Sequence, residues 1–191
     1  MSTAVRSPHP QTWTIAPAAV GSPEALALLR AYFVEVSDRY YRLHEGRDST
    51  PIEIEEGLAD APSDHLAPPR GLFLIGRYGG EPAACAGLLL RDARTAELTR
   101  VFIRPDLRGT GGGRRLMAAV DDAARPLGVA RIVLDTRLDL VEARTLYTRS
   151  GYAEVPAHNS GKYAEIWYAK DLDGTDRPEP AGAGVHRPDR A

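Results

Sequence analysis

The residues of this chain with the clearest chemistry form a glycine-rich turn at residues 108–114, Arg-Gly-Thr-Gly-Gly-Gly-Arg. Apolar side chains at helical spacing (Leu116, Val120 and Leu127) follow it, which predicts a helix from about Gly111. A helix N-terminus without side chains presents N–H groups at the positive end of the helix dipole. The turn therefore indicates an anion site, and a pyrophosphate fits this chemistry best.

Two common phosphate-binding motifs do not match the turn. A P-loop ends in Gly-Lys-Ser/Thr, whereas residues 113–115 read Gly-Arg-Arg. In a dinucleotide-binding fingerprint counted from Gly109, Arg114 occupies the place of the third glycine. The spacing alone leaves two hypotheses open, a phosphate-binding loop and an ordinary flexible loop that precedes a helix.

The residues around the turn resemble the GNAT superfamily of N-acetyltransferases. The segment Arg108-x-x-Gly111-x-Gly113 is similar to that family's Q/R-x-x-G-x-G/A signature, and residues 97–105 and 143–152 also look like the family. The resemblance is close over residues 96–155, and the order of the expected elements extends it over residues 12–172. It implies an α/β (α+β) fold with a mixed, mostly antiparallel sheet, a central splay and helices on both faces.

The resemblance also implies that acetyl-CoA binds as cosubstrate where the strand ending near Ile103 separates from the strand at residues 131–135. Backbone amides of the turn would hold the pyrophosphate, and the preceding strand would pair with the pantetheine and donate an N–H to the acyl carbonyl. The implied cofactor-binding residues are Phe102, Ile103, Arg108, Gly109, Thr110, Gly111, Gly112, Gly113 and Arg114. Leu140 departs from the family pattern, because many relatives have Asn there, and this removes one polar contact to CoA.

Two residues match catalytic positions of the family. Glu97 matches its frequent general base, but proton transfer from an ammonium group to an ordinary glutamate costs about 8 kcal/mol, so we expect Glu97 to order a relaying water. Tyr147 matches its general acid; transfer from a phenol to a thiolate costs about 2 kcal/mol, so we expect a hydrogen bond to the developing thiolate. Structural interpretations stay open, with Glu97 as a solvated strand carboxylate and Tyr147 as a core aromatic.

The acceptor side is expected to include polar and aromatic residues of the first helix and of the connection before the last strand. The candidates are Tyr40, Tyr41, His158, Asn159 and Tyr163, with His44 and Ser160 beside them. Nothing in these residues encodes which amine is bound. Cys85 lies in an apolar segment, which predicts a small buried side chain, and the five histidines contain no close pair, which predicts no metal site.

A regular alternation of elements is expected to position these residues. Expected strands cover residues 12–16, 71–78, 83–90, 96–103, 131–135 and 163–169, with a hairpin turn at 79–82. Expected helices run from Ser22-Pro23 to about residue 41, over 51–59, from about Gly111, and from an Asp139–Glu142 capping box to Ser150-Gly151.

Composition limits the class of protein. The 191 residues carry 24 Lys and Arg against 26 Asp and Glu, which argues against nucleic-acid binding. No apolar run approaches the roughly 18–20 residues that span a bilayer, and no signal peptide is evident, so we expect a cytoplasmic protein without membrane contact. Residues rich in Pro, Gly and charge predict disordered tails at 1–11 and 173–191 around a single GNAT domain at 12–172.

Together these observations predict an acetyl-CoA-dependent N-acetyltransferase without a metal. The acceptor would be a primary amine of a small molecule or peptide, attacking directly in a ternary complex, and a homodimer is left open. One alternative is a CoA-binding relative that uses another acyl group or has no catalysis. The other is a nucleoside-phosphate-binding α/β protein that uses the turn at residues 108–114.

Overall fold

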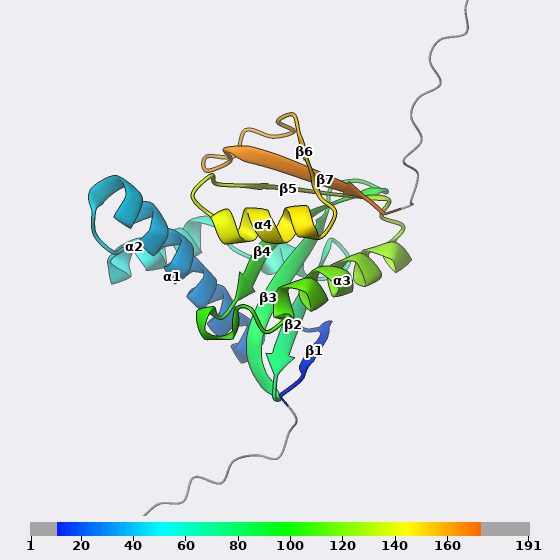
Figure 1. Cartoon of the computed structure of the whole chain (residues 1–191), viewed down its shortest axis with the longest axis horizontal. Coiled ribbons are helices and arrows are strands. Elements are labelled where there is room, and N and C mark those ends of the chain that lie inside the picture. Colours follow the sequence, from blue (N-terminus) through cyan, green and yellow to red (C-terminus); the bar gives the residue numbers. More distant parts are fainter. Residues whose placement is uncertain (1–10, 173–191) are drawn as a thin grey trace, which may run out of the picture.

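The computed structural model describes residues 11–172, which form one seven-stranded sheet with four helices (Figure 1). The strands are β1 (Trp13–Pro17), β2 (Gly71–Tyr78), β3 (Glu81–Leu90), β4 (Thr95–Ile103), β5 (Arg131–Thr136), β6 (Ala153–Val155) and β7 (Ile166–Asp171). The helices are α1 (Pro23–Glu45), α2 (Pro51–Asp60), α3 (Gly112–Ala124) and α4 (Val141–Arg149). Apart from residue 11, the tails expected at 1–11 and 173–191 lie outside the described residues.

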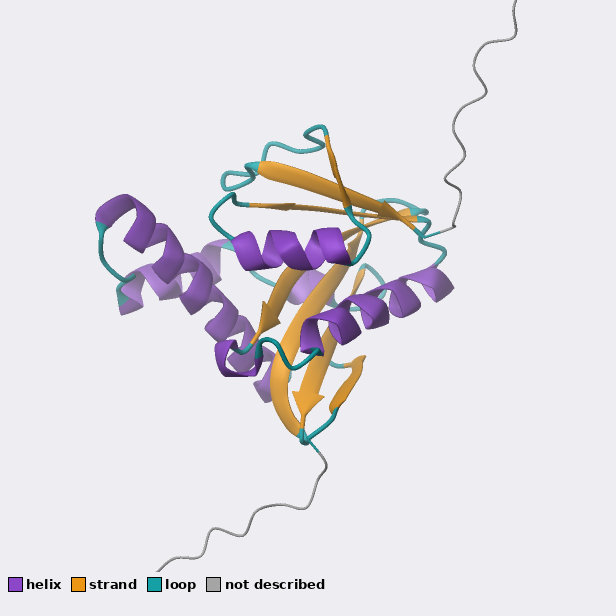
Figure 2. Ribbon diagram, in the orientation of Figure 1, coloured by secondary structure: helices purple, strands orange, loops and turns teal. Residues whose placement is uncertain are grey.

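The sheet has the order β1-β2-β3-β4-β5-β7-β6. Only β4 and β5 are parallel, and all other neighbours are antiparallel, so the expected mixed, mostly antiparallel sheet is confirmed. The β4–β5 ladder comprises three pairs, from Thr95–Arg131 to Glu97–Val133. Beyond Glu97 the two strands no longer pair, and this separation is the expected central splay. Figure 2 shows β4 and β5 at a wide angle to each other.

Alternate residues of the central strands pack into two separate hydrophobic cores, one on each face of the sheet. Leu74 packs with Leu116 and Val120 of α3, whereas its neighbours Phe73 and Ile75 pack in the cluster that holds the α1 side chains. The α1 members of that cluster are Ala25, Leu28 and Leu29. Helices therefore cover both faces, as the sequence predicts.

Local signals account for the starts of α1 and α2. The hydroxyl of Ser22 accepts the Ala25 N–H at 3.3 Å, with Pro23 at the first helical position. Thr50 and Glu53 form a complete capping box at the start of α2. Helix α1 is four residues longer than expected. It ends at Glu45, and the next residue, Gly46, has a φ of +68° that suits a left-handed C-cap.

The expected capping box at Asp139 and Glu142 is wrong. Helix α4 has Leu140 at its N-cap and no capping side chain. The Asp139 carboxylate instead accepts two hydrogen bonds from Arg137, and that of Glu142 accepts two from Arg39, 103 residues earlier in the chain. Bidentate arginine pairing has therefore displaced the local cap.

The last part of the sheet also differs from the expectation. Strand β7 begins at Ile166 rather than at residue 163, because residues 161–164 form a turn in which the Ala164 N–H donates to the Gly161 carbonyl. Strand β6 was not expected at all. It has only three residues and pairs with β7 alone, so it carries little periodicity of its own.

Candidate functional site

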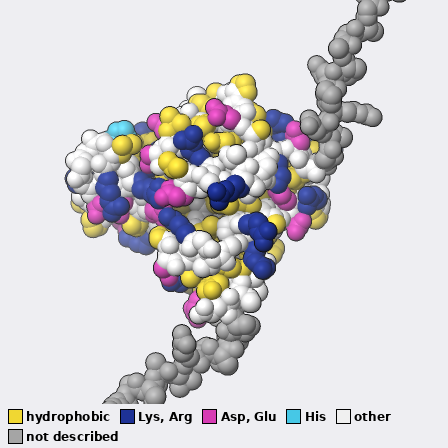
Figure 3. Space-filling view, viewed as in Figure 1, with side chains coloured by type: hydrophobic (Ala, Val, Ile, Leu, Met, Phe, Trp, Pro, Cys, Tyr) yellow, Lys and Arg dark blue, Asp and Glu magenta, His cyan; other side chains and the backbone are white. Residues whose placement is uncertain are grey.

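A cavity of about 300 Å³ lies where β4 and β5 separate. It is bordered by α1, β4, the glycine-rich turn, β5 and α4. The lining residues are Tyr32, Glu35, Val36, Arg39, Leu98, Thr99, Arg100, Val101, Phe102, Ile103, Arg108, Gly109, Gly113, Asp135, Thr136, Leu140, Glu142, Ala143, Leu146 and Tyr147. Figure 3 shows basic side chains, with acidic ones among them, in a band across the middle of this face.

Two glycines of the turn leave backbone open to a ligand. Gly109 and Gly111 have φ values of +83° and +89°, which side-chain-bearing residues rarely adopt, and a Cβ on either would meet nothing within 4 Å. Gly111 is the N-cap of α3, so the first N–H groups of this helix point toward the turn. This open, positively polarised backbone fits a phosphate group.

The next two glycines have a packing role. A Cβ on Gly112 would overlap the ring of Trp13, and one on Gly113 would lie 3.0 Å from Leu146. The Thr110 hydroxyl accepts the Trp13 indole N–H at 2.9 Å and donates to the Leu107 carbonyl at 2.7 Å. Packing therefore explains why Gly112 and Gly113 lack side chains. In the described part of the chain Gly109 and Gly111 have no such packing neighbours, so a ligand remains the explanation for them.

The two arginines of the turn differ. Arg114 is exposed. The Arg108 amide donates to the Pro105 carbonyl at 3.3 Å, and its guanidinium donates to the Ile103 carbonyl at 3.2 Å and to Glu35. Both Ile103 and its buried neighbour Phe102 line the cavity. The side chain of Arg108 therefore joins the turn to the end of β4.

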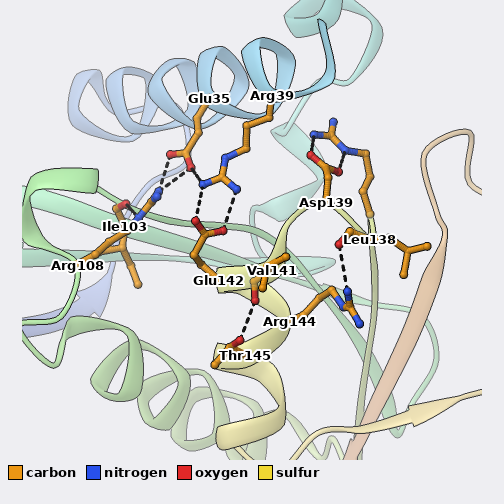
Figure 4. Close-up of polar contacts among 11 residues, drawn as sticks. Glu35, Arg39, Ile103, Arg108, Leu138, Asp139, Val141, Glu142, Arg144 and Thr145 are labelled. Carbon is orange, nitrogen blue, oxygen red and sulfur yellow. Dashed lines mark hydrogen bonds and ion pairs between the residues drawn. The ribbon is translucent and has the colours of Figure 1, made fainter. Parts of the chain in front are cut away.

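Arg108 also begins a charge chain of four residues, Arg108–Glu35–Arg39–Glu142, that crosses the cavity from the turn through α1 to α4 (Figure 4). Glu35 accepts from Arg108 at 2.6 Å and lies 3.3 Å from the Arg39 guanidinium. Arg39 in turn donates two hydrogen bonds to Glu142, at 2.8 and 3.1 Å. These bonds hold the pKa of Glu142 well below its usual range. All four charges are thus paired with one another.

Tyr147 is both a core residue and a cavity residue. Its side chain is buried, and its ring lies 6.0 Å from those of Tyr152 and Tyr168. Burial raises the pKa of its phenol, with smaller contributions from Tyr32 and the Asp135 carboxylate. A phenol is protonated at neutral pH even at its ordinary pKa, so Tyr147 can act as a hydrogen-bond donor in the cavity.

Glu97 lies at a different place from Tyr147. It is the last β4 residue that pairs with β5, it is not among the residues that line the cavity, and its carboxylate is bound by Arg91. The carboxylates that do line the cavity are Glu35, Glu142 and Asp135. Sequence reasoning missed Asp135, although its place at the end of a strand beside the expected splay was a signal.

The predicted acceptor residues gather next to the cavity without lining it. The Tyr40 ring lies 5.5 Å from that of Tyr163 and 5.6 Å from that of Tyr41. A ring nitrogen of His158 lies 3.3 Å from the Leu134 carbonyl. Asn159 is tied to a lining residue, since its amide N–H donates to Asp135 at 2.7 Å.

Other sequence expectations concern residues outside the cavity. Cys85 is fully buried, as expected, and burial raises its pKa to about 12, so it is not a nucleophile at neutral pH. Within residues 11–172, no three His, Cys, Asp or Glu side chains are grouped to bind a metal. No helix in this part of the chain is long and apolar enough to cross a membrane.

A sequence model of the GNAT acetyltransferase family matches residues 29–152. The chain is similar to an IAA acetyltransferase of Azospirillum brasilense, with 30% identity over 112 residues, 53% of this chain and 73% of that protein. A solved Klebsiella pneumoniae structure, assigned as an acyl-CoA N-acyltransferase, has a TM-score of 0.64 and 25% identity, and the match covers 85% and 99% of the two chains. A GNAT acetyltransferase of Elizabethkingia anophelis, solved with acetyl-CoA bound, has the same fold at 17% identity and a TM-score of 0.54, covering 83% and 97%.

Proposed function

Because the chain belongs to the GNAT family of acetyltransferases, we propose that it transfers an acetyl group from acetyl-CoA to a primary amine by direct attack in a ternary complex. The observation that carries this proposal is the cavity at the splay, which has open glycine backbone at one end and the buried Tyr147 phenol in its wall. The glycine backbone thus suits a phosphate, and the phenol suits a leaving group. We propose a small molecule or a peptide as the acceptor.

Acetyl-CoA supplies an activated acyl carbonyl and a thiolate leaving group. The amides at Gly109 and Gly111, with the N-terminus of α3, would bind its pyrophosphate. Beyond Glu97, β4 has no β5 partner, so its backbone at Phe102 and Ile103 would pair with the pantetheine and its N–H groups would bind the acyl oxygen. The Tyr147 phenol would donate a hydrogen bond to the sulfur.

The acceptor amine must lose a proton during the reaction. We keep the proposal that Glu97 acts through an ordered water, and its position outside the cavity lining agrees with an indirect role. Its bond to Arg91 fixes the direction of the carboxylate. The water would pass the amine proton to solvent, so that Glu97 need not keep it.

Gly111→Asp tests the phosphate site. We expect the acetyl-CoA affinity to fall at least tenfold, about 1.4 kcal/mol, because a carboxylate would face the pyrophosphate at the open turn. Isothermal calorimetry with acetyl-CoA, CoA and ATP measures the effect. Gly79→Asp is the matched control, since Gly79 also has a positive φ and open surroundings but lies in the β2–β3 turn.

The same titrations separate the alternatives. Wild-type affinity in Gly111→Asp removes the turn from the phosphate site. Binding of ATP, without binding of acetyl-CoA, favours the nucleoside-phosphate hypothesis. Binding of acetyl-CoA without thiol release in an amine screen favours a CoA-binding relative that has no catalysis.

Glu97→Gln tests the water relay. We expect a lower kcat near neutral pH with little change in acetyl-CoA affinity, and a partial recovery at high pH, where more of the amine is already neutral. Thiol release measured as a function of pH gives kcat near neutral pH and at high pH, and calorimetry gives the acetyl-CoA affinity. Arg91→Gln serves as a companion variant that frees the carboxylate without removing it. If Glu97→Gln has the wild-type kcat at every pH, Glu97 is a solvated strand carboxylate.

A further inference from the structure

Two of the six charged side chains that line the cavity have no ion-pair partner among residues 11–172. Glu35, Arg39, Arg108 and Glu142 form the charge chain and neutralise one another. The other two are Arg100 of β4 and Asp135 of β5, one cation and one anion on the two strands that separate. A partly buried charge without a counterion is costly, so such a pair of opposite charges suits a ligand that supplies both counterions.

Arg100 is held in place by neutral groups only. Its guanidinium donates to the Ser63 hydroxyl at 3.2 Å, to the Ala61 carbonyl at 3.1 Å and to the Thr99 hydroxyl at 3.3 Å. It also lies over the Phe33 ring, 5.1 Å from its centroid. These bonds use three of its five N–H donors, and the guanidinium also interacts with the neutral Tyr32 phenol. Its orientation is therefore fixed, and its positive charge has no counterion among residues 11–172.

The backbone at Arg100 supports a ligand-binding role. In residues 11–172 Arg100 is the one non-glycine residue with a positive φ, at +54°. It lies where the β3–β4 register shifts, between the pairs Gly87–Thr99 and Cys85–Phe102. Irregularities of this kind occur next to binding sites, where they redirect a side chain.

The Asp135 carboxylate, like the Arg100 guanidinium, is held in place by a neutral group. One carboxylate oxygen accepts the Asn159 amide N–H at 2.7 Å, and the Asn159 carbonyl is itself held by Trp167 at 3.1 Å and Gly161 at 3.2 Å. The amide fixes the carboxylate but does not neutralise it. Asp135 and Tyr147 both line the cavity, and the Asp135 carboxylate adds to the effect of burial in raising the pKa of the Tyr147 phenol.

We propose that the acceptor is amino-acid-like, carrying an anionic group beside its primary amine: Arg100 binds the anion, and Asp135 binds the amine near Tyr147. This inference rests on the proposed acetyltransferase function and specifies its substrate class. A carboxylate can accept two parallel hydrogen bonds from the planar guanidinium, and a phosphate can do the same. The two sources of negative charge are separated by the acceptors used in the test.

The test compares each standard amino acid that has a primary α-amine with its carboxamide, and aminoethyl phosphate with ethanolamine, as acceptors in a thiol-release assay. We expect kcat/KM to be at least tenfold higher for the anionic member of at least one pair. Arg100→Gln should bring that ratio near one by raising KM, while the acetyl-CoA affinity stays unchanged. Asp135→Asn should lower kcat/KM at least tenfold for both members of the pair.

Two further variants keep the test decisive. Arg100→Lys retains the charge but loses the fork, so it should keep part of the preference even if Arg100→Gln folds poorly. Arg77→Gln, on the remote strand β2, should leave the preference intact. Three results would overturn the inference. The wild-type enzyme could acetylate the carboxamides as well as the amino acids, or it could acetylate neutral aryl amines but no anionic acceptor. The preference for the anionic acceptor could also persist in Arg100→Gln. Absence of acetyl-CoA binding overturns the proposed function itself.

Discussion

Tyr147→Phe is expected to lower kcat about a hundredfold while acetyl-CoA affinity stays nearly unchanged, a loss of about 2.7 kcal/mol of transition-state stabilisation. The phenol is buried and lines the cavity, and burial raises its pKa further above neutral pH. A donor fixed in a site that excludes water acts mainly when negative charge develops on the sulfur. Pre-steady-state thiol release and calorimetry measure the rate and the affinity separately.

Tyr152→Phe is the matched control for this variant. Its ring belongs to the same aromatic cluster, 6.0 Å from that of Tyr147, and its buried hydroxyl has no hydrogen-bond partner among residues 11–172. Removing that hydroxyl should leave kcat unchanged. Phenylalanine fills the space of either tyrosine, so a wild-type kcat in Tyr147→Phe would show that residue 147 contributes packing alone.

Lys170→Met should lower the free energy of unfolding by about 3 kcal/mol. Lys170 donates to the Asp121 carboxylate at 2.5 Å and to the Ser150 carbonyl at 2.7 Å, which ties β7 to α3 and to the end of α4. The two side chains are 21% and 12% exposed, so methionine would leave a mostly buried carboxylate without a counterion. Urea unfolding followed by circular dichroism gives the value.

A double variant separates the charge effect from lost packing. Lys170→Met combined with Asp121→Asn removes both charges, and we expect it to recover most of the stability lost in Lys170→Met alone. In the part of the chain that the structure describes, one oxygen of Asp121 already lacks a hydrogen-bond partner, so no second donor there replaces Lys170. Equal stability of wild type and Lys170→Met would show that water solvates the carboxylate.

The parts of the fold that the sequence predicts well are those with local causes. Ser22 and Pro23 start α1 where expected, and the glycines at 79 and 80 close the β2–β3 hairpin. The Asp139–Glu142 cap failed for one local and one non-local reason: Arg137, two residues away, binds the Asp139 carboxylate, and Arg39 binds the Glu142 carboxylate from another helix. The second of these causes could not be read from the sequence around α4.

The candidate site shows the same division. The turn was predictable from its glycine content, and the splay from the similarity to a known family. The packing role of Gly112 was not, because it depends on Trp13, which comes into contact only in the folded chain. Arg100 and Asp135 could not be singled out among many charges until every other cavity charge was seen to have a partner.

The three-pair ladder between β4 and β5 has a consequence for how long the protein persists in a cell. Thr95, Ala96 and Glu97 carry the backbone pairing that joins the two parts of the sheet. Acetyl-CoA bound between β4 and β5 would supply backbone-type hydrogen bonds that the polypeptide lacks there. The same hydrogen bonds would then contribute to binding and to the stability of the fold. At a free concentration one hundred times its Kd, the cosubstrate would add about 2.7 kcal/mol to the free energy of unfolding. The total supply of CoA and acetyl-CoA, which share the pantetheine, would then affect how much of the enzyme stays folded, whereas acetyl-CoA alone would support its rate.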